Sequence, residues 1–238
     1  MPERLEPGRI HVAVDILIFT VREGRLSLLL ARRKNPPFRN YWALPGRFVG
    51  LEESAEAAVR KLLAEMLPVR DVYMEQLYTF TALNRDPRGR TISMAYMIIL
   101  PWQKLQAALE EEDVQLRCFG VNHDAGGLYL TAEGEEAITL TAGDLAFDHG
   151  EIIRTGVTRL QGKIDYTDVS FRFLSDTAAF SLSELQTVFE AVLDTPVDSS
   201  NFRRSIRGRY EQSGRIEQTV QAKQQGRGRP AVLYRLVK

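Results

Sequence analysis

The chain has 238 residues, of which 44% are hydrophobic and 26% are charged, a composition typical of a globular protein with a sizeable core. This length suits one large domain or two modest ones. Cys118 is the only cysteine, which excludes an intrachain disulfide and favours a reducing compartment. The N-terminal stretch MPERLEPGRI has no apolar run of signal-peptide length, so we expect a cytoplasmic protein with no membrane partner.

The net charge is zero, but it is unevenly distributed along the chain. Residues 201–238 contain ten Lys/Arg and two Asp/Glu, a balance of +8. The other 200 residues therefore hold 21 basic and 29 acidic side chains, a balance of −8. A basic terminal segment on an acidic body indicates a site for a polyanion.

The first part of the chain alternates between predicted hairpins and helices. HVAVDILIFT and RLSLLLARR are β-rich runs separated by VREG, which predicts a hairpin. A helix is expected from Ser54 to Leu67, with Ser54 as its N-cap, and a shorter one over WQKLQAALEEED. Two further predicted hairpins pair EQLYTFTAL with RTISMAYMIIL and GGLYLTAEG with EAITLTAG. This order favours a mixed α/β sandwich over a parallel doubly wound sheet.

The pattern changes near Gly143. The segment DLAFDHGEIIRTGVTRLQGKI is amphipathic and predicts a linker helix, and FSLSELQTVFEAVL predicts a helix capped by Ser181 or Ser183. A short helix at NFRRSIRG and a two-stranded ribbon follow, which is the order of a winged helix-turn-helix. We therefore expect three parts, namely a first domain over 1–143, a linker helix over 144–168 and a winged helix over 169–238.

The short helix carries a cluster of arginines. Phe202 and Ile206 are four residues apart and can dock the helix on its own domain. Arginines on the opposite side suit phosphate oxygens and guanine edges, and a helix start capped by Asp198 or Ser199 also favours a phosphate. With the ribbon tip, the expected DNA contacts are Ser199, Ser200, Asn201, Arg203, Arg204, Arg207, Lys223, Arg227 and Arg229.

Two other interpretations of this basic unit compete with duplex DNA. One is a solvated basic hairpin without a partner. Single-stranded RNA fits less well, because Phe202 is expected to be buried and Tyr210 is the other aromatic available for stacking. Duplex DNA explains both basic elements, because they fall where a winged helix meets the duplex.

The segment from Gly46 to Pro68 resembles the Nudix box, whose helix gathers a divalent metal on glutamates. Gly46, Glu52 and Arg60 fall at the family's separations, and a register shifted by one residue uses Glu53 in place of Glu52. Lys61 and Ala64 stand where glutamates are expected, and of the box glutamates on the helix only Glu65 remains. We therefore expect no catalytic residue, no metal site and no required cofactor.

The whole chain resembles the Nudix-related transcriptional regulators, in which a degenerate Nudix domain precedes a C-terminal winged helix. The motifs that carry this resemblance are PPFRNYWALPGRFV, LYTFTALNRDPRGRTIS, LAFDHGEII, NFRRSI and GRGRPAVLYR. The resemblance implies an α+β fold and a homodimeric repressor or activator on a palindromic operator. It also implies a metabolite effector, either ADP-ribose with control of NAD biosynthesis or a pentose with control of sugar catabolism.

The expected effector site follows from the box and a nearby turn. Arg47 departs from the family, which commonly has a second glycine there; its guanidinium either meets a phosphate or fills the space of a diphosphate. The expected ligand-binding residues are Arg47, Glu52, Glu53, Glu65, Arg88 and Arg90, although Arg88 and Arg90 also suit a solvated turn. The alternative function is an active, metal-dependent Nudix pyrophosphatase that acts on a nucleoside diphosphate derivative.

Overall fold

A mixed sheet centred on β1 (His11–Arg22) forms the first part of the computed structural model, which describes residues 8–67, 69, 72–109, 116–133, 137–223 and 231–237. The main path of the sheet runs β5-β6-β1-β2-β7-β8-β9, with β3 beside β2 and β4 beside β1. β1 and β6 are parallel, whereas β1–β2, β5–β6 and β8–β9 are antiparallel, which confirms the three predicted hairpins. The other strands are β2 (Arg25–Arg32), β3 (Trp42–Ala43), β4 (Gly46–Phe48), β5 (Tyr73–Phe80), β6 (Thr91–Ile99), β7 (Leu116–Asp124), β8 (Gly127–Ala132) and β9 (Ile138–Thr141).

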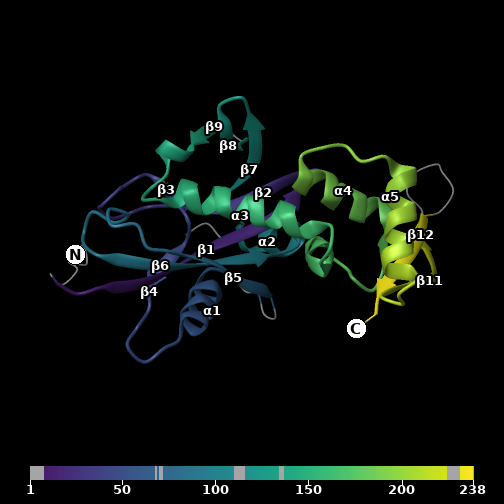
Figure 1. The fold of residues 1–238 in the computed structure, drawn as a ribbon, viewed down its shortest axis with the longest axis horizontal. Coiled ribbons are helices and arrows are strands. Elements are labelled where there is room, and N and C mark those ends of the chain that lie inside the picture. Colours follow the sequence, from purple (N-terminus) through teal and green to yellow (C-terminus); the bar gives the residue numbers. More distant parts are fainter. Residues whose placement is uncertain are drawn as a thin grey trace.

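Helices cover both faces of the sheet, and this confirms the predicted α/β/α sandwich (Figure 1). Along β1, Ile16 and Ile18 pack in the cluster with α1 (Ala55–Met66) and α2 (Trp102–Leu109). Leu17 and Phe19 point to the other face, where they join the cluster that contains α3 (His149–Ile164). The period-two alternation of a strand thus divides one apolar run between two layers.

Helix α1 begins as the sequence predicts. The Ser54 side chain accepts a hydrogen bond from the backbone N–H of Ala57 at 3.1 Å, which caps the helix. Its buried positions are Ala58, Val59, Leu62 and Leu63, and they face the sheet. Arg60 and Lys61 are exposed on the other side of the helix.

The C-terminal part has the predicted winged-helix order. α4 (Leu182–Leu193) and α5 (Ser199–Ile206) are followed by a π-helical turn (Arg207–Glu211) and the ribbon β11 (Ile216–Lys223) and β12 (Ala231–Leu236). β12 lies between β10 (Phe180–Ser181) and β11 in a small sheet. Ser181, not Ser183, caps α4, since its hydroxyl accepts from the Glu184 N–H at 3.1 Å and the Glu184 carboxylate accepts in return.

Helix α3 starts later than the amphipathic pattern predicts, and it is closely packed on the sheet. It begins at His149; Leu145 forms a bridge with Trp42 instead of a helical turn. At Gly156 the helix comes so close to β1 that an added Cβ would lie 2.2 Å from Leu17 Cδ2. Its other end contacts α4, and one continuous apolar cluster runs from the sheet through α3 into the winged helix.

Strand β7 was not predicted from the sequence. Its residues, LRCFGVNHD, mix polar and apolar types with a glycine, so they lack a clear strand pattern. Pairing with β2 on one side and β8 on the other nevertheless stabilises it as an interior strand. No helix among the described residues combines the length and the apolar content needed to cross a lipid bilayer.

Candidate functional sites

A polar cavity of about 560 Å³ opens beside the N-terminal half of β1. Its walls come from β1, the loop and short strands over 33–48, the turn over 85–91 and the segment that precedes α3. This volume lies within the usual range for small-molecule sites. The side chains that line it are those of Ala13, Asp15, Arg33, Asn35, Pro36, Leu44, Arg47, Phe48, Arg85, Asp86, Arg88, Thr91, Phe147 and His149, together with Gly46.

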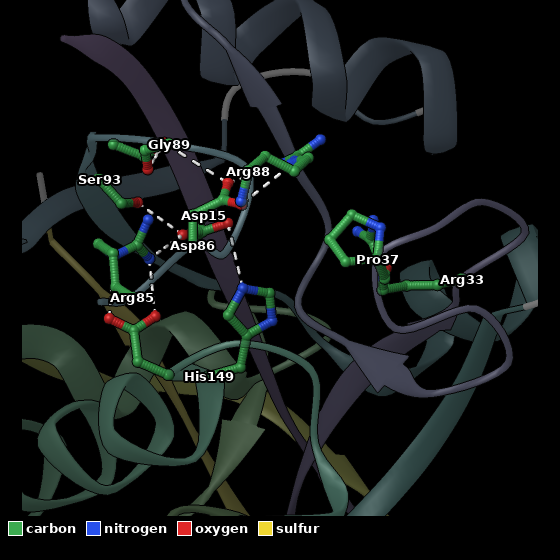
Figure 2. A network of polar contacts seen from close by, with 11 residues as sticks. Asp15, Arg33, Pro37, Arg85, Asp86, Arg88, Gly89, Ser93 and His149 are labelled. Carbon is green, nitrogen blue, oxygen red and sulfur yellow. Dashed lines mark hydrogen bonds and ion pairs between the residues drawn. The ribbon is translucent and has the colours of Figure 1, made fainter. Parts of the chain in front are cut away.

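Asp15 is the centre of a buried polar network at the back of this cavity (Figure 2). Its Oδ2 accepts a hydrogen bond from Ser93 Oγ at 2.6 Å and another from Arg85 Nη2 at 3.2 Å. The residue is only 7% exposed, so its charge requires partners supplied by the protein. Two separate segments, β6 and the turn over 85–91, are thereby tied to β1.

Arg85 connects this network to the start of α3. Its Nε and Nη2 donate to the two carboxylate oxygens of Asp148 at 2.9 and 2.7 Å, a bidentate geometry that suits a guanidinium. Burial acts to lower the pKa of Arg85, but the hydrogen bonds to Asp148 and the charge of Asp15 outweigh it and raise that pKa. Because Asp148 immediately precedes α3, the turn over 85–91 is fastened to that helix.

His149 is held as a neutral imidazole. Its Nδ1 accepts a hydrogen bond from the Leu44 backbone N–H at 2.8 Å, so the ring proton is on Nε2, which lies 3.5 Å from Asp15 Oδ1. Burial lowers the pKa of His149, although the negative charge of Asp15 acts in the opposite direction. The imidazole therefore joins β1 to α3 without adding a charge.

Gly46, the glycine at which the Nudix-box resemblance starts, has a steric reason to be a glycine. A Cβ at this position would lie 2.3 Å from Asp15 Oδ1 and 2.9 Å from the Val14 carbonyl oxygen. β4 can approach β1 this closely only without a side chain there. The glycine at position 46 thus leaves room for the Asp15 carboxylate beside β4.

Two arginines meet at one aromatic ring on the cavity wall. The guanidinium carbons of Arg33 and Arg88 lie 4.7 and 5.6 Å from the ring centre of Phe147. Arg88 is also bidentate to Asp86, at 3.0 and 2.8 Å. Burial lowers the pKa of Arg33, and the positive charge of Arg88 lowers it further. An anionic ligand group at this wall would relieve the repulsion between the two guanidiniums.

The predicted ligand residues are only partly brought together. Arg47 and Arg88 line the cavity, and the carboxylates of Glu53 and Glu65 lie 3.4 and 3.6 Å from the Arg47 guanidinium. Glu52 is exposed in the turn before α1 and does not line the cavity. Arg90 donates to the carbonyl oxygens of Thr81 and Ala82 at 2.8 and 3.0 Å, away from the cavity lining, and fixes the ends of its own loop.

Most of the residues that build the cavity wall were missed from the sequence. One signal was available, because Asp15 is a lone charge within the apolar run HVAVDILIF, and an unpaired charge there would be costly. The partners had no local signal, since they come from distant loops and the start of a helix. The missed residues are Asp15, Arg33, Arg85, Asp86, Ser93, Phe147, Asp148 and His149.

The second candidate site is the exposed face of α5. Phe202 and Ile206 are 5% and 2% exposed, which confirms that they dock the helix on its own domain. Arg203, Arg204 and Arg207 project from the other side and are exposed, as predicted. The hydrogen-bond partners of the first two are neutral, with Arg204 Nη2 donating to Asn201 Oδ1 at 2.7 Å and Arg203 Nη2 to Ser183 Oγ at 3.4 Å.

The start of α5 is ordered by two side-chain contacts. Asp198, not Ser199, caps the helix, and its carboxylate accepts from the Asn201 N–H at 2.8 Å. Ser199 instead donates to Gln186 Oε1 at 2.9 Å, which ties α5 to α4. Ser200 is exposed. These contacts hold the first turn of α5 in place against α4.

The ribbon residues expected at DNA are described only in part. Lys223 is the last residue of β11, and nothing of its side chain is described. Arg227 and Arg229 lie outside the described residues. Arg207 connects the two elements, because its Nε lies 3.3 Å from the Tyr234 hydroxyl of β12 and 3.8 Å from Glu211.

Comparison with known proteins identifies both parts. The Nudix domain profile matches residues 9–127, and the profile of the NrtR DNA-binding winged helix domain matches residues 171–236. The chain is 33% identical over 226 residues to a protein of Acinetobacter baylyi (strain ATCC 33305 / BD413 / ADP1) named ADPR responsive transcriptional repressor NtrR; the match covers 94% of this chain and 81% of that protein. An ADP-ribose pyrophosphatase of Methanocaldococcus jannaschii is 30% identical over 150 residues, which cover 63% of this chain and 77% of that enzyme.

A solved structure agrees with this assignment over nearly the full length. The crystal structure of Shewanella oneidensis NrtR complexed with a 27mer DNA superposes with a TM-score of 0.75 at 31% sequence identity. The match covers 95% of this chain and 93% of that chain, so it includes the sandwich, α3 and the winged helix together. This chain belongs to the family of Nudix-related transcriptional regulators of the NrtR type.

Proposed function

We propose that the protein is a transcriptional regulator that binds duplex DNA through α5 and releases or retains it in response to ADP-ribose held in the Nudix cavity. The exposed arginine face of α5 is the observation that carries this proposal. Arg203 and Arg204, whose hydrogen-bond partners among the described residues are neutral, suit phosphates and the major-groove edge of guanine. The Acinetobacter relative is named as an ADPR-responsive repressor, and the Shewanella structure contains DNA, which supports both halves.

ADP-ribose fits the cavity better than a free pentose does. The volume of about 560 Å³ is much larger than a pentose, and an unfilled polar cavity would hold one weakly. The wall also presents Arg33, Arg47 and Arg88, and an uncharged sugar gives these cations no partner. A diphosphate supplies the matching charge and geometry.

We assign the transmission of the signal to α3. Its first residue, His149, and Phe147 just before the helix form part of the cavity wall, and its 16 residues span about 24 Å. At the far end, Gln161 Nε2 donates to the Val192 carbonyl oxygen of α4 at 3.1 Å. A shift of Phe147 on effector binding would therefore move the winged helix with α3.

The expected assembly is a homodimer on a palindromic operator. Two recognition helices must lie about 34 Å apart to enter successive major grooves, so a small rotation between protomers is enough to change the fit. Arg203, Arg204 and Arg207 would contact phosphates and base edges, while Lys223, Arg227 and Arg229 would hold the flanking backbone. We place this activity in the cytoplasm, where the operator and the metabolite are both accessible.

The rival function is hydrolysis, and the Methanocaldococcus relative, named an ADP-ribose pyrophosphatase, is the observation that favours it. We propose that hydrolysis is absent, because Lys61 and Ala64 replace box glutamates and Lys61 brings a cation to the helix. Incubation of the protein with ADP-ribose and Mg²⁺ should release no AMP above background. Steady release of AMP would favour the enzyme.

Titration of a labelled duplex from the gene's own upstream region tests the proposal. We expect saturable binding at moderate salt and a change in affinity when ADP-ribose is added at saturating concentration. Ribose at the same concentration serves as the control and should leave the affinity unchanged. A protein that ignores such duplexes and turns over ADP-ribose briskly would contradict the proposed function.

A further inference from the structure

Arg47 occupies an unusual position relative to the acidic residues of the Nudix box. Its Nη2 lies 3.4 Å from Glu53 Oε1, and its Nη1 lies 3.6 Å from Glu65 Oε1. The same guanidinium lines the cavity in which we propose that the effector binds. One guanidinium thus lies beside two carboxylates of the box segment, those of Glu53 and Glu65, and also lines the cavity.

These carboxylates do not fit the divalent ion that the Nudix family implies. Mg²⁺ requires near-octahedral oxygen ligands at about 2.0–2.1 Å, and both glutamates here already face a guanidinium. Glu53 Oε1 also accepts from the Gly50 N–H at 2.8 Å, which holds it in the turn. Within the described part of the chain, no group of three or more His, Cys, Asp and Glu side chains is placed to hold a metal ion.

Arg47 has hydrogen-bonding capacity left over. Its Nη1 is buried, and it has no hydrogen-bond partner among the described residues, because the 3.6 Å approach to Glu65 is too long. A buried donor of this kind costs free energy until an acceptor reaches it. The oxygen of an anionic ligand in the adjoining cavity is such an acceptor.

We propose that Arg47 is a resident cation that takes the place of the metal ion, both by neutralising Glu53 and Glu65 and by meeting the anionic group of the effector. The second half of this statement rests on the proposed function. The substitution of a fixed guanidinium for a divalent ion makes effector binding independent of divalent metals. It also removes the Lewis acid on which Nudix hydrolysis depends, so the ligand is bound and left intact.

The test measures Mn²⁺ binding by electron paramagnetic resonance of the full-length protein. Arg47→Ala should bind Mn²⁺ at least about tenfold more tightly than the wild type, because a positive charge beside two carboxylates is removed. Arg47→Gln is a second variant that keeps most of the side-chain length and should show the same gain. Equal Mn²⁺ affinity in the wild type and both variants would overturn the proposal.

Two controls assign the gain to this pair of glutamates. Arg60→Ala removes the same charge from the exposed side of α1 and should leave Mn²⁺ affinity unchanged. An equal gain in this variant would show that the gain comes from the change in net charge alone, and it would overturn the assignment. Adding Glu65→Gln to Arg47→Ala should abolish the gain. A gain that survives would show that Glu65 is not part of the site.

Effector binding provides the separate readout. ADP-ribose should bind the wild type equally well with EDTA or with Mg²⁺, and Arg47→Ala should lower that affinity about tenfold or more. If the wild type bound ADP-ribose more tightly with Mg²⁺ than with EDTA, the proposal that Arg47 takes the place of the metal ion would be overturned. Failure of ADP-ribose to bind the wild type would overturn the proposed effector, while the Mn²⁺ result alone decides the relation of Arg47 to the glutamates.

Discussion

Arginines serve opposite purposes in the cavity and on α5. The Arg85 side chain is 4% exposed and is balanced by Asp15 and Asp148, so its charge is satisfied within the fold. Arg203 and Arg204 are exposed and have neutral hydrogen-bond partners. The comparison shows that charge balanced by the chain determines architecture, and charge left unbalanced at the surface indicates a partner outside it.

The largest effect is expected from breaking the buried network. Arg85→Leu should lower the free energy of unfolding by about 3–5 kcal/mol, because the buried carboxylate of Asp15 and the half-buried one of Asp148 lose their counterion. Denaturant unfolding followed by circular dichroism measures it. Arg90→Leu is the matched control from the same turn and should cost much less, since its hydrogen bonds are exposed. A cost below about 1 kcal/mol for Arg85→Leu would show that the network is not structural.

The opposite result is expected on α5. Arg204→Ala should weaken operator binding by about 1–3 kcal/mol, or roughly fivefold to 150-fold, and leave the melting temperature nearly unchanged. Arg209→Ala removes the same charge from the following turn, where the guanidinium lies over the Tyr210 ring, and should have little effect. Fluorescence anisotropy with a labelled duplex decides between them. Full-strength binding by Arg204→Ala would contradict the DNA assignment.

The contact between the sandwich and α3 can be tested by two glycines of one helix. Gly156→Ala should destabilise the protein by about 1–3 kcal/mol, since the new methyl group would lie 2.2 Å from Leu17 Cδ2. Gly162→Ala meets nothing within 4 Å and should stabilise the helix by up to about 1 kcal/mol. Thermal unfolding of both variants measures the difference. Equal effects at the two positions would mean that α3 is not closely packed on β1.

The smallest effect concerns pH. Burial lowers the pKa of His149 in the folded state, although Asp15 and Asp148 act in the opposite direction, so the unfolded chain takes up the proton first as the pH falls. This stability is present above the unfolded pKa of about 6.5 and declines below it, by about 0.7 kcal/mol between pH 7 and pH 6. His149→Gln should flatten that decline in denaturant titrations. If the free energy of unfolding of His149→Gln fell with pH as steeply as that of the wild type, His149 would not be held neutral in the folded protein.

The sequence predicted the parts of the fold that local rules control. Ser54 caps α1 and Phe202 docks α5, because capping and the helical repeat depend on neighbours along the chain. β7 and the late start of α3 were missed because strand pairing and the Trp42–Leu145 bridge come from distant segments.

The site residues also divide into those that local sequence predicts and those that depend on distant segments. Arg204 could be found because its exposure follows from the helical position of its neighbours. Asp15, Arg85 and His149 come together only when β1, a turn and α3 have packed, so no single motif contains them. The box motif pointed to Arg47, but its role between Glu53 and Glu65 required the fold.

The salt dependence of duplex affinity tests the central claim most directly. We would compare the wild type with a variant in which Arg203, Arg204 and Arg207 are all alanine. For each phosphate that the variant no longer neutralises, the slope of log affinity against log salt concentration should fall in magnitude by about one. The account predicts weaker binding with a clearly shallower slope for the variant. An unchanged affinity and an unchanged slope would contradict it, because α5 would then not be the surface that meets DNA.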